Sequence, residues 1–174
     1  KGSIYQAGIS VPFIIAGPSI ITPNRVSDAL VNTQDLFGTI LEIFGDTAWA
    51  GRIPIPIKVD SKSLVPILKN QSASVRDWAF SEVFKIPTVA GDGKTMRNKD
   101  YKLLDFDNGT QKFFDLTNDP AETNDLLKST LTPVQQSNYT SLCNLMSTLV
   151  GSGRFCDIAS GVDEGGQSSD EQDR

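Results

Sequence analysis

The residues best suited to chemistry form a group of cations near the middle of the chain. Lys94, Arg97, Lys99 and Lys102 fall within nine residues of one another. Clustered positive charge attracts anions, so an anionic substrate is one interpretation of this group. The alternative is the solvated face of a strand, from which long charged side chains extend into water.

Three aspartates close behind the cations are the other chemical candidates. Asp105, Asp107 and Asp115 could bind a hard cation through their carboxylate oxygens. Their spacing matches no metal-binding loop, and turn formation at Asp107 explains their presence equally well. The acidic segment 119–124 is interpreted in the same way, as a turn before a short helical stretch.

Histidine is absent from the sequence. Its absence excludes Ser-His triads, zinc–histidine sites and histidine acid–base pairs from this chain. The sequence also contains neither a Gly-x-Ser-x-Gly nucleophile elbow nor a glycine-rich phosphate loop. Taken alone, the chain offers no complete active site.

The composition sets the class of protein. The 174 residues carry 16 basic and 21 acidic side chains, a net charge of −5, and 39% are hydrophobic. This is enough apolar material for a folded core, in one domain or part of a larger one. No apolar run approaches the roughly 18 residues of a membrane span. The acidic balance argues against a nucleic-acid surface.

The first third of the chain has an α/β pattern. Residues 9–16 form a short, continuous apolar run that ends at Gly-Pro, as in a strand buried on both faces. Residues 32–45 predict a strongly amphipathic helix, with Asn32 as its N-cap and Gly45 as its C-terminal cap. A buried strand followed by such a helix is typical of α/β domains.

The middle of the chain predicts an antiparallel sheet. Residues 46–75 contain several prolines and predict an extended excursion with a short turn. After it, residues 78–84, 101–106 and 112–116 alternate as strands do, and an Asn-Gly turn joins the last two. Residues 85–97 are expected to form a loop rich in glycine, proline and cations.

A final helix is expected to pack on this sheet. Thr132 and Gln135 predict a capping box with proline at the first helical position, and Gly151 ends the apolar stripe. Cys143, within this expected helix, and Cys156, beyond it, form a disulfide candidate, which would contribute roughly 3 kcal/mol by closing a short loop. Two unrelated thiols are the alternative.

The predicted fold class is therefore α/β, with four segments. Residues 1–50 form the C-terminal end of an α/β sheet domain, 51–75 a linker, 76–155 a small antiparallel-sheet subdomain with its packing C-terminal helix, and 156–174 an acidic tail expected to be disordered. Three glycosylation sequons begin at Asn70, Asn108 and Asn138. With the cysteines, they favour an extracellular, periplasmic or lysosomal (secretory) protein.

Five stretches, in order, resemble one enzyme family. Residues 1–12, Lys-Gly-Ser-Ile-Tyr-Gln-Ala-Gly-Ile-Ser-Val-Pro, are similar to the stretch Lys-Gly-Thr-x-Tyr-Glu-Gly-Gly-x-Arg-x-Pro of type I sulfatases. Residues 26–41 resemble the helix Asp-Leu-Phe-Pro-Thr-Ile-Leu of these enzymes, with Gly38 in place of the proline. Residues 76–82, 96–103 and 114–126 resemble motifs of the C-terminal sheet of this arylsulfatase-like family, which belongs to the alkaline-phosphatase superfamily.

This resemblance implies a C-terminal fragment of a sulfatase, whose parent hydrolyses sulfate esters with calcium and a formylglycine. Lys1 aligns with the lysine that contacts the sulfate and assists the leaving oxygen, although an exposed terminal lysine is the alternative. Gln6 and Ser10 replace residues of the family pattern and leave the surroundings of Lys1 open. Lys85 and Lys94, in the cationic loop, are the candidates for binding the sulfated small molecule or glycan.

The motifs for calcium and formylglycine lie N-terminal to this stretch in the family, so the chain alone is expected to bind no cofactor and to be inactive. It is also expected to need the preceding part of its own domain, because an unpaired apolar strand would expose a sticky edge. Two alternatives stay open: a phosphodiesterase or phosphonate hydrolase of the same superfamily, and a non-catalytic module that binds a glycan or a protein partner.

Overall fold

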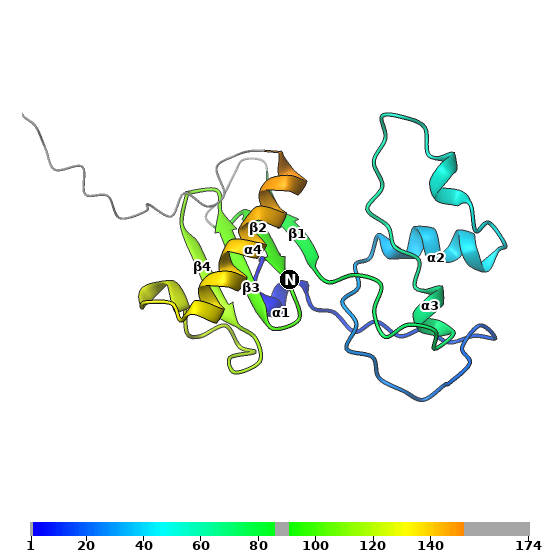
Figure 1. Ribbon diagram of the computed structural model, residues 1–174, viewed down its shortest axis with the longest axis horizontal. Coiled ribbons are helices and arrows are strands. Elements are labelled where there is room, and N and C mark those ends of the chain that lie inside the picture. Colours follow the sequence, from blue (N-terminus) through cyan, green and yellow to red (C-terminus); the bar gives the residue numbers. More distant parts are fainter. Residues whose placement is uncertain (1, 86–90, 152–174) are drawn as a thin grey trace, which may run out of the picture.

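The computed structural model describes residues 2–85 and 91–151 (Figure 1). A four-stranded sheet with one long helix forms one part of the molecule, and two short helices with their connecting segments form the other. The helices and strands are α1 (Gln6–Ile9), α2 (Asp35–Ile43), α3 (Val65–Leu68), β1 (Ala79–Val83), β2 (Gly93–Arg97), β3 (Tyr101–Phe106), β4 (Gln111–Asp115) and α4 (Pro133–Val150), with 3-10 turns at Trp49–Arg52 and Leu126–Lys128. None of the helices in the described residues is long and apolar enough to cross a membrane.

The sheet is antiparallel throughout, in the order β1-β2-β3-β4. Strands β1, β3 and β4 lie where alternation predicts them, and the Asn-Gly turn joins β3 to β4. Strand β2 corrects the prediction of a loop over residues 85–97, because residues 93–97 pair with both neighbouring strands. Its side chains Thr95 and Met96 are buried on opposite faces, so an inner strand with both faces covered lacks the polar alternation that marks a strand in sequence.

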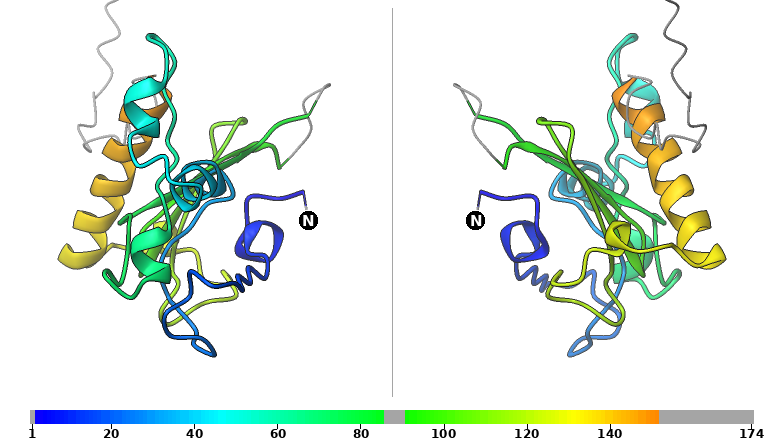
Figure 2. Two further views of the ribbon diagram at one scale, coloured as in Figure 1. Left: turned by 90° about the vertical axis from the view of Figure 1, so that its right-hand side faces the viewer. Right: turned by 90° about the vertical axis from the view of Figure 1, so that its left-hand side faces the viewer.

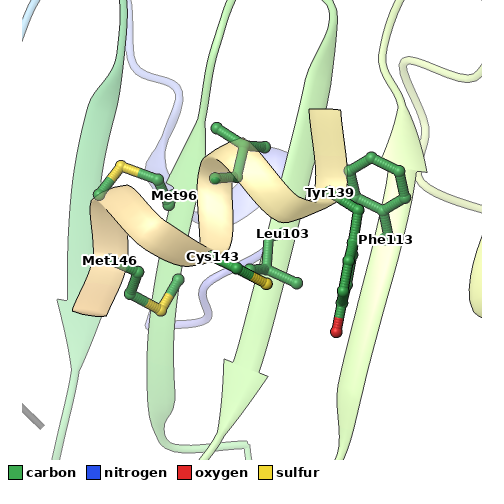
Figure 3. Packing of buried hydrophobic residues seen from close by; sticks show 7 residues of the cluster. Met96, Leu103, Phe113, Tyr139, Cys143 and Met146 are labelled. Atoms are coloured by element: carbon green, nitrogen blue, oxygen red, sulfur yellow. The ribbon is translucent and has the colours of Figure 1, made fainter. Parts of the chain in front are cut away.

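Helix α4 covers one face of the sheet, as predicted (Figure 2). Met96, Leu103 and Phe113 of the sheet pack there against Tyr139, Leu142, Cys143 and Met146 of α4, all buried (Figure 3). The expected capping box is present, since the Thr132 hydroxyl accepts a hydrogen bond from the Gln135 amide and the Gln135 side chain accepts one from the Thr132 amide. Gly151 ends the helix at φ 73°, a left-handed conformation that glycine adopts readily.

The N-terminal segment covers the opposite face of the sheet (Figure 2). Ile4 is fully buried between Leu104 of β3 and Phe114 of β4, and Tyr5 and Phe106 pack around them. The sheet therefore separates two hydrophobic clusters, one under α4 and one under the segment that leads into α1.

The strand expected over residues 9–16 is not formed, and this prediction is wrong for the chain as described. Ile9 is the last residue of α1, and residues 10–16 have no regular structure. Val11 and Ile14 are exposed to 50% and 88%. A doubly buried strand needs a neighbour on each edge, and none of the described residues supplies one here.

Helix α2 confirms the amphipathic helix but not its expected cap. Gln34 is the N-cap residue, and Asn32 donates its backbone amide to the Asp35 carboxylate at 2.8 Å. The helix ends at Ile43, and Gly45 follows at φ 94°. Its apolar face is largely uncovered by the described residues, with Phe37, Ile40, Ile43 and Phe44 all exposed and Trp49 meeting only the edge of this face at Phe37.

Gly38 of α2, which replaces the proline of the family pattern, lies against the indole of Trp49 in the following 3-10 turn. A Cβ at this position would lie 2.4 Å from Cζ2 of Trp49, and the Gly38 amide donates to the Ser61 hydroxyl at 2.9 Å. A proline here would lose that hydrogen bond. The indole of Trp49, which also meets the Phe37 ring edge-on at 5.7 Å, takes the space of a side chain.

We expect Gly38→Ala to destabilise the fold by about 1 kcal/mol. Alanine gains roughly 0.5–1 kcal/mol of helix propensity over glycine, but overpacking against a rigid indole costs roughly 1–3 kcal/mol. Gly51→Ala is the matched control, because a Cβ there meets nothing within 4 Å. Urea unfolding measures the change in unfolding free energy for both variants. A Gly38→Ala protein as stable as wild type would contradict the view that the Trp49 indole leaves no room for a Cβ at this position.

Candidate functional site

The segment that follows Lys1 is fixed to the sheet at three points. Lys1 itself lies outside the described residues. The first point is Ile4, which is buried completely against β3 and β4. The second is Tyr5, whose hydroxyl accepts a hydrogen bond from the Lys112 ammonium at 2.8 Å. The third is the backbone amide of Gln6, the first residue of α1, which donates to the Glu122 carboxylate.

Glu122 is held from the other side by a buried cation. Its Oε1 lies 2.7 Å from Nζ of Lys102, and both side chains are almost completely buried. Lys102 is on β3, on the same face as Leu104 and Phe106, opposite to the face covered by α4. One carboxylate therefore links the middle of the sheet to the first turn of α1.

Burial dominates the electrostatics of this pair. Burial lowers the pKa of the Lys102 ammonium, and the hydrogen bond and negative charge of Glu122 act in the opposite direction. Arg97, the register partner of Lys102 on β2, lowers that pKa further through its own charge. A buried charge that loses its partner is costly, so neither member of the pair is replaceable alone.

Lys112 is a third cation near this segment, after Lys102 and Arg97. Its ammonium lies 5.5 Å from the centre of the Tyr5 ring and 5.9 Å from that of Phe106. The hydrogen bond to the Tyr5 hydroxyl raises the pKa of the Lys112 ammonium. Cations over aromatic rings are attracted to the face of the ring, so Lys112 orients Tyr5 through both its ring and its hydroxyl.

The turn that carries Glu122 is tightly organised. Asp119 accepts hydrogen bonds from the amides of Thr123 and Asn124 at 3.1 and 2.8 Å, and these bonds lower the pKa of its carboxyl group. Glu122 adopts φ 56°, which is uncommon for a residue with a side chain. The turn predicted from the acidic segment 119–124 is confirmed, and it places the Glu122 carboxylate against the Gln6 amide of α1.

A second buried ion pair joins α2 to the start of the sheet region. The Asp35 carboxylate, fully buried, accepts hydrogen bonds from the Arg76 guanidinium and from the amides of Asn32 and Lys62, the last two at 2.8 Å each. Arg76 also donates to the Asp60 carbonyl at 3.0 Å and lies over the Trp78 ring at 5.9 Å. This pair ties three separate segments together at one point.

The two lysines predicted to bind substrate lie around the β1–β2 connection, whose residues 86–90 are outside the described ranges. Lys85 is exposed two residues after β1, and its amide donates to the Asp92 carboxylate at 2.9 Å. Lys94 is on β2, and its ammonium lies 3.4 Å from a carboxylate oxygen of Asp107. The structure thus places Lys94 at the hairpin turn, beside Asp107, one of the aspartates considered as cation ligands.

The other predicted sites are placed as follows. Cys143 is a buried residue of α4, and Cys156 lies outside the described residues, so the disulfide stays a prediction. Asn70 and Asn108 are exposed in turns. Asn138 is half-buried on α4, donates to the Val134 carbonyl at 2.9 Å and accepts a hydrogen bond from Asn98 at 2.8 Å.

A polar groove lies apart from the segment that follows Lys1. It lies between residues 25–30, 70–77 and 98–100. Charges of both signs line it, among them Arg25, Asp77 and Asp100, and Arg25 is held by the Ile67 carbonyl. Lys99, one of the four clustered cations, lines this groove, whereas Lys85 and Lys94 do not.

No group of three or more metal-binding side chains occurs among residues 2–85 and 91–151. These residues alone therefore do not supply a ligand set for the calcium that the resemblance implies for the whole protein. Asp105 and Asp115, two of the aspartates considered as ligands, are instead hydrogen-bonded to Gln111 and to Asn118, each at 2.8 Å.

Sequence reasoning missed the pairing of Glu122 with Lys102. The signal was available for Lys102, since in the strand Tyr-Lys-Leu-Leu-Asp-Phe it shares its face with Leu104 and Phe106. A lysine on an apolar face must find a carboxylate. Which carboxylate it finds is a contact between distant turns, and periodicity does not reveal it.

Comparison with known proteins was made for both sequence and fold. A family model described as "N-sulphoglucosamine sulphohydrolase, C-terminal" matches residues 1–147. A sulfatase from Formosa agariphila is 32% identical over 150 residues, which cover 79% of this chain and 26% of that protein. Arylsulfatase K from Rattus norvegicus is 30% identical over 132 residues, covering 70% of this chain and 22% of that protein.

Among solved structures, a 2-O GAG sulfatase has a similar fold, with a TM-score of 0.52 at 22% identity over 78% of this chain and 27% of that one. The predicted fold class, the end of an α/β domain followed by a small antiparallel sheet and its helix, is confirmed by this likeness. The chain spans about a quarter of the length of the curated relatives it matches.

Proposed function

Since this chain belongs to the family of the N-sulphoglucosamine sulphohydrolase C-terminal domain, we propose that it is the C-terminal part of a sulfatase. The whole protein hydrolyses a sulfate ester, and this part contributes Lys1 and a portion of the wall of the substrate cleft. The observation that carries the proposal is the anchoring of the segment after Lys1. Ile4 and Tyr5 are held by the sheet, and Gln6 by Glu122 of the turn that follows β4, as a segment that delivers a catalytic side chain requires.

The proposed role of Lys1 follows from the charge changes of the reaction. Hydrolysis transfers the sulfuryl group to water, and the bond between sulfur and the leaving oxygen breaks. Negative charge develops on that oxygen, and a positioned ammonium group stabilises the charge in the transition state. The same ammonium is able to donate a proton to the departing alkoxide.

The proposed substrate is a sulfated sugar. The family model is named after an enzyme of sulphoglucosamine, and the relatives compared above carry the names of sulfatases. Lys85 and Lys94 are proposed to contact the anionic groups of the sugar from the β1–β2 connection. Calcium and the formylglycine are assigned to the rest of the protein, because the family resemblance places their motifs N-terminal to this stretch.

The rest of the domain is the proposed partner of the exposed apolar surfaces. The exposed face of α2 and the apolar residues 11–14 would pack against the larger sheet of the same domain. A secretory location is proposed as well, and the exposed sequons at Asn70 and Asn108 support it.

A comparison of the whole protein with the 174-residue chain tests this proposal. The whole protein is expected to hydrolyse an aryl sulfate such as 4-nitrophenyl sulfate, and the isolated chain is expected to show only the rate of a buffer blank. Bis(4-nitrophenyl) phosphate serves as the competing substrate. Faster turnover of the phosphodiester than of the sulfate by the whole protein would overturn the proposal, as would turnover by the isolated chain.

A further inference from the structure

We propose that Glu122, ion-paired to Lys102, is a positioning residue that fixes the register of the segment carrying Lys1. This inference rests on the proposed function and adds to it a residue that acts through another. Glu122 reaches the segment through one backbone hydrogen bond, from the Gln6 amide, and is itself held by Lys102 at 2.7 Å.

The two carboxylate oxygens of Glu122 contact different partners. Oε1 faces Lys102 in the middle of the sheet, and Oε2 accepts the Gln6 amide. Gln6 is the first residue of α1, where a backbone amide has no partner within the helix. Because the carboxylate is buried on both sides, its position is fixed by the sheet and not by solvent.

A change of register in this segment would also displace Lys1. Lys1 precedes Ile4 by three residues, so a slip of the segment by one residue, about 3.6 Å at full extension, would carry Lys1 with it. Ile4 and Gln6 both being fixed, the segment cannot slide by one residue without exposing Ile4 and losing the Glu122 contact. A displacement of about 1 Å at a reacting group can lower a rate by roughly 100-fold.

The surroundings of Glu122 separate a positioning role from a purely structural one. The core under α4 lies on the opposite face of the sheet and shares no buried residue with the cluster around Ile4. A buried ion pair is often replaced by apolar residues without loss of stability. The amide of Gln6, in contrast, needs an acceptor whatever the stability of the pair.

Two double variants of the whole protein isolate that acceptor. Lys102→Met with Glu122→Gln removes both charges but keeps a side-chain oxygen for the Gln6 amide. Lys102→Met with Glu122→Met removes the charges and the oxygen. Met146→Ala is the control, because it weakens the core under α4 and touches nothing on the α1 face.

Three readouts are compared for each variant: the melting temperature, kcat and KM on 4-nitrophenyl sulfate, and the amide exchange rates of residues 4–9. We expect Lys102→Met with Glu122→Met to lose about 10- to 100-fold in kcat and to exchange these amides at least tenfold faster. Lys102→Met with Glu122→Gln is expected to stay within about threefold of wild type in kcat and in exchange rate, although the buried amide of its glutamine makes it the less stable of the two double variants. Met146→Ala is expected to lower the melting temperature and to leave kcat unchanged.

The inference is overturned if the amides of residues 4–9 exchange at the same rate in the two double variants, or if kcat follows the melting temperature across all three variants. A wild-type protein that is inactive on 4-nitrophenyl sulfate counts against the proposed function instead. In that case the exchange comparison alone upholds or overturns the positioning role of Glu122.

Discussion

Replacing Lys1 by alanine in the whole protein is expected to lower kcat for a sulfate ester by roughly 100- to 1,000-fold, the usual loss when one group that stabilises a developing oxyanion is removed. KM is expected to change less than kcat, because the charge that Lys1 compensates is larger in the transition state than in the bound ester. Steady-state kinetics on 4-nitrophenyl sulfate measures both constants.

Two further variants make this result specific. Lys1→Arg keeps the positive charge but not the compact ammonium, so it is expected to recover only part of the rate. Lys128→Ala removes an exposed lysine on the 3-10 turn before α4 and is expected to leave kcat unchanged. A Lys1→Ala protein with kcat within threefold of wild type would show that this lysine has no part in the reaction.

The second large effect is expected at Asp35. Asp35→Ala leaves the Arg76 guanidinium buried without its carboxylate and the amides of Asn32 and Lys62 without an acceptor. Breaking a buried ion pair in this way costs about 3–5 kcal/mol of unfolding free energy. Urea unfolding of the whole protein, followed by fluorescence and by circular dichroism, measures the loss.

The exposed pair of Arg52 and Asp46 supplies the control for Asp35. These side chains approach to 3.0 Å, but that of Arg52 is 72% exposed. A solvent-exposed ion pair contributes at most about 1 kcal/mol, so Asp46→Ala is expected to cost little. Equal losses from Asp35→Ala and Asp46→Ala would contradict the view that the buried pair holds α2 to the sheet region.

Elements stabilised by local chemistry could be predicted from the sequence. The β3–β4 hairpin has an Asn-Gly turn between alternating residues, and α4 has its capping box and terminal glycine. The features that the sequence did not predict depend on contacts between residues that are far apart along the chain. Strand β2 is defined by its two neighbours, and the apolar run at 11–16 has no neighbour among the described residues that could make it a strand.

The candidate site could be predicted only in part, for the same reason. Lys1 was identified by resemblance, and Lys85 and Lys94 by charge. The anchor at Glu122 lies 116 residues from Gln6 along the chain, and its turn is explained locally by Asp119 without any reference to a partner. Spacing along a sequence shows which residues share a face, but it does not show which turn packs against which helix.

The uncovered face of α2 has a consequence for how the protein is made. In the proposed whole protein these 174 residues are synthesised after the larger part of the domain, and their synthesis takes roughly 9–35 s at 5–20 residues per second. Residues 11–14 and α2 lie in the first quarter of this stretch, so they are made roughly 2–9 s after it begins, and until then the earlier part of the domain lacks the surface that they provide. A nascent chain that stops before α2 would leave that earlier apolar surface exposed and would be a client of chaperones that bind such surfaces.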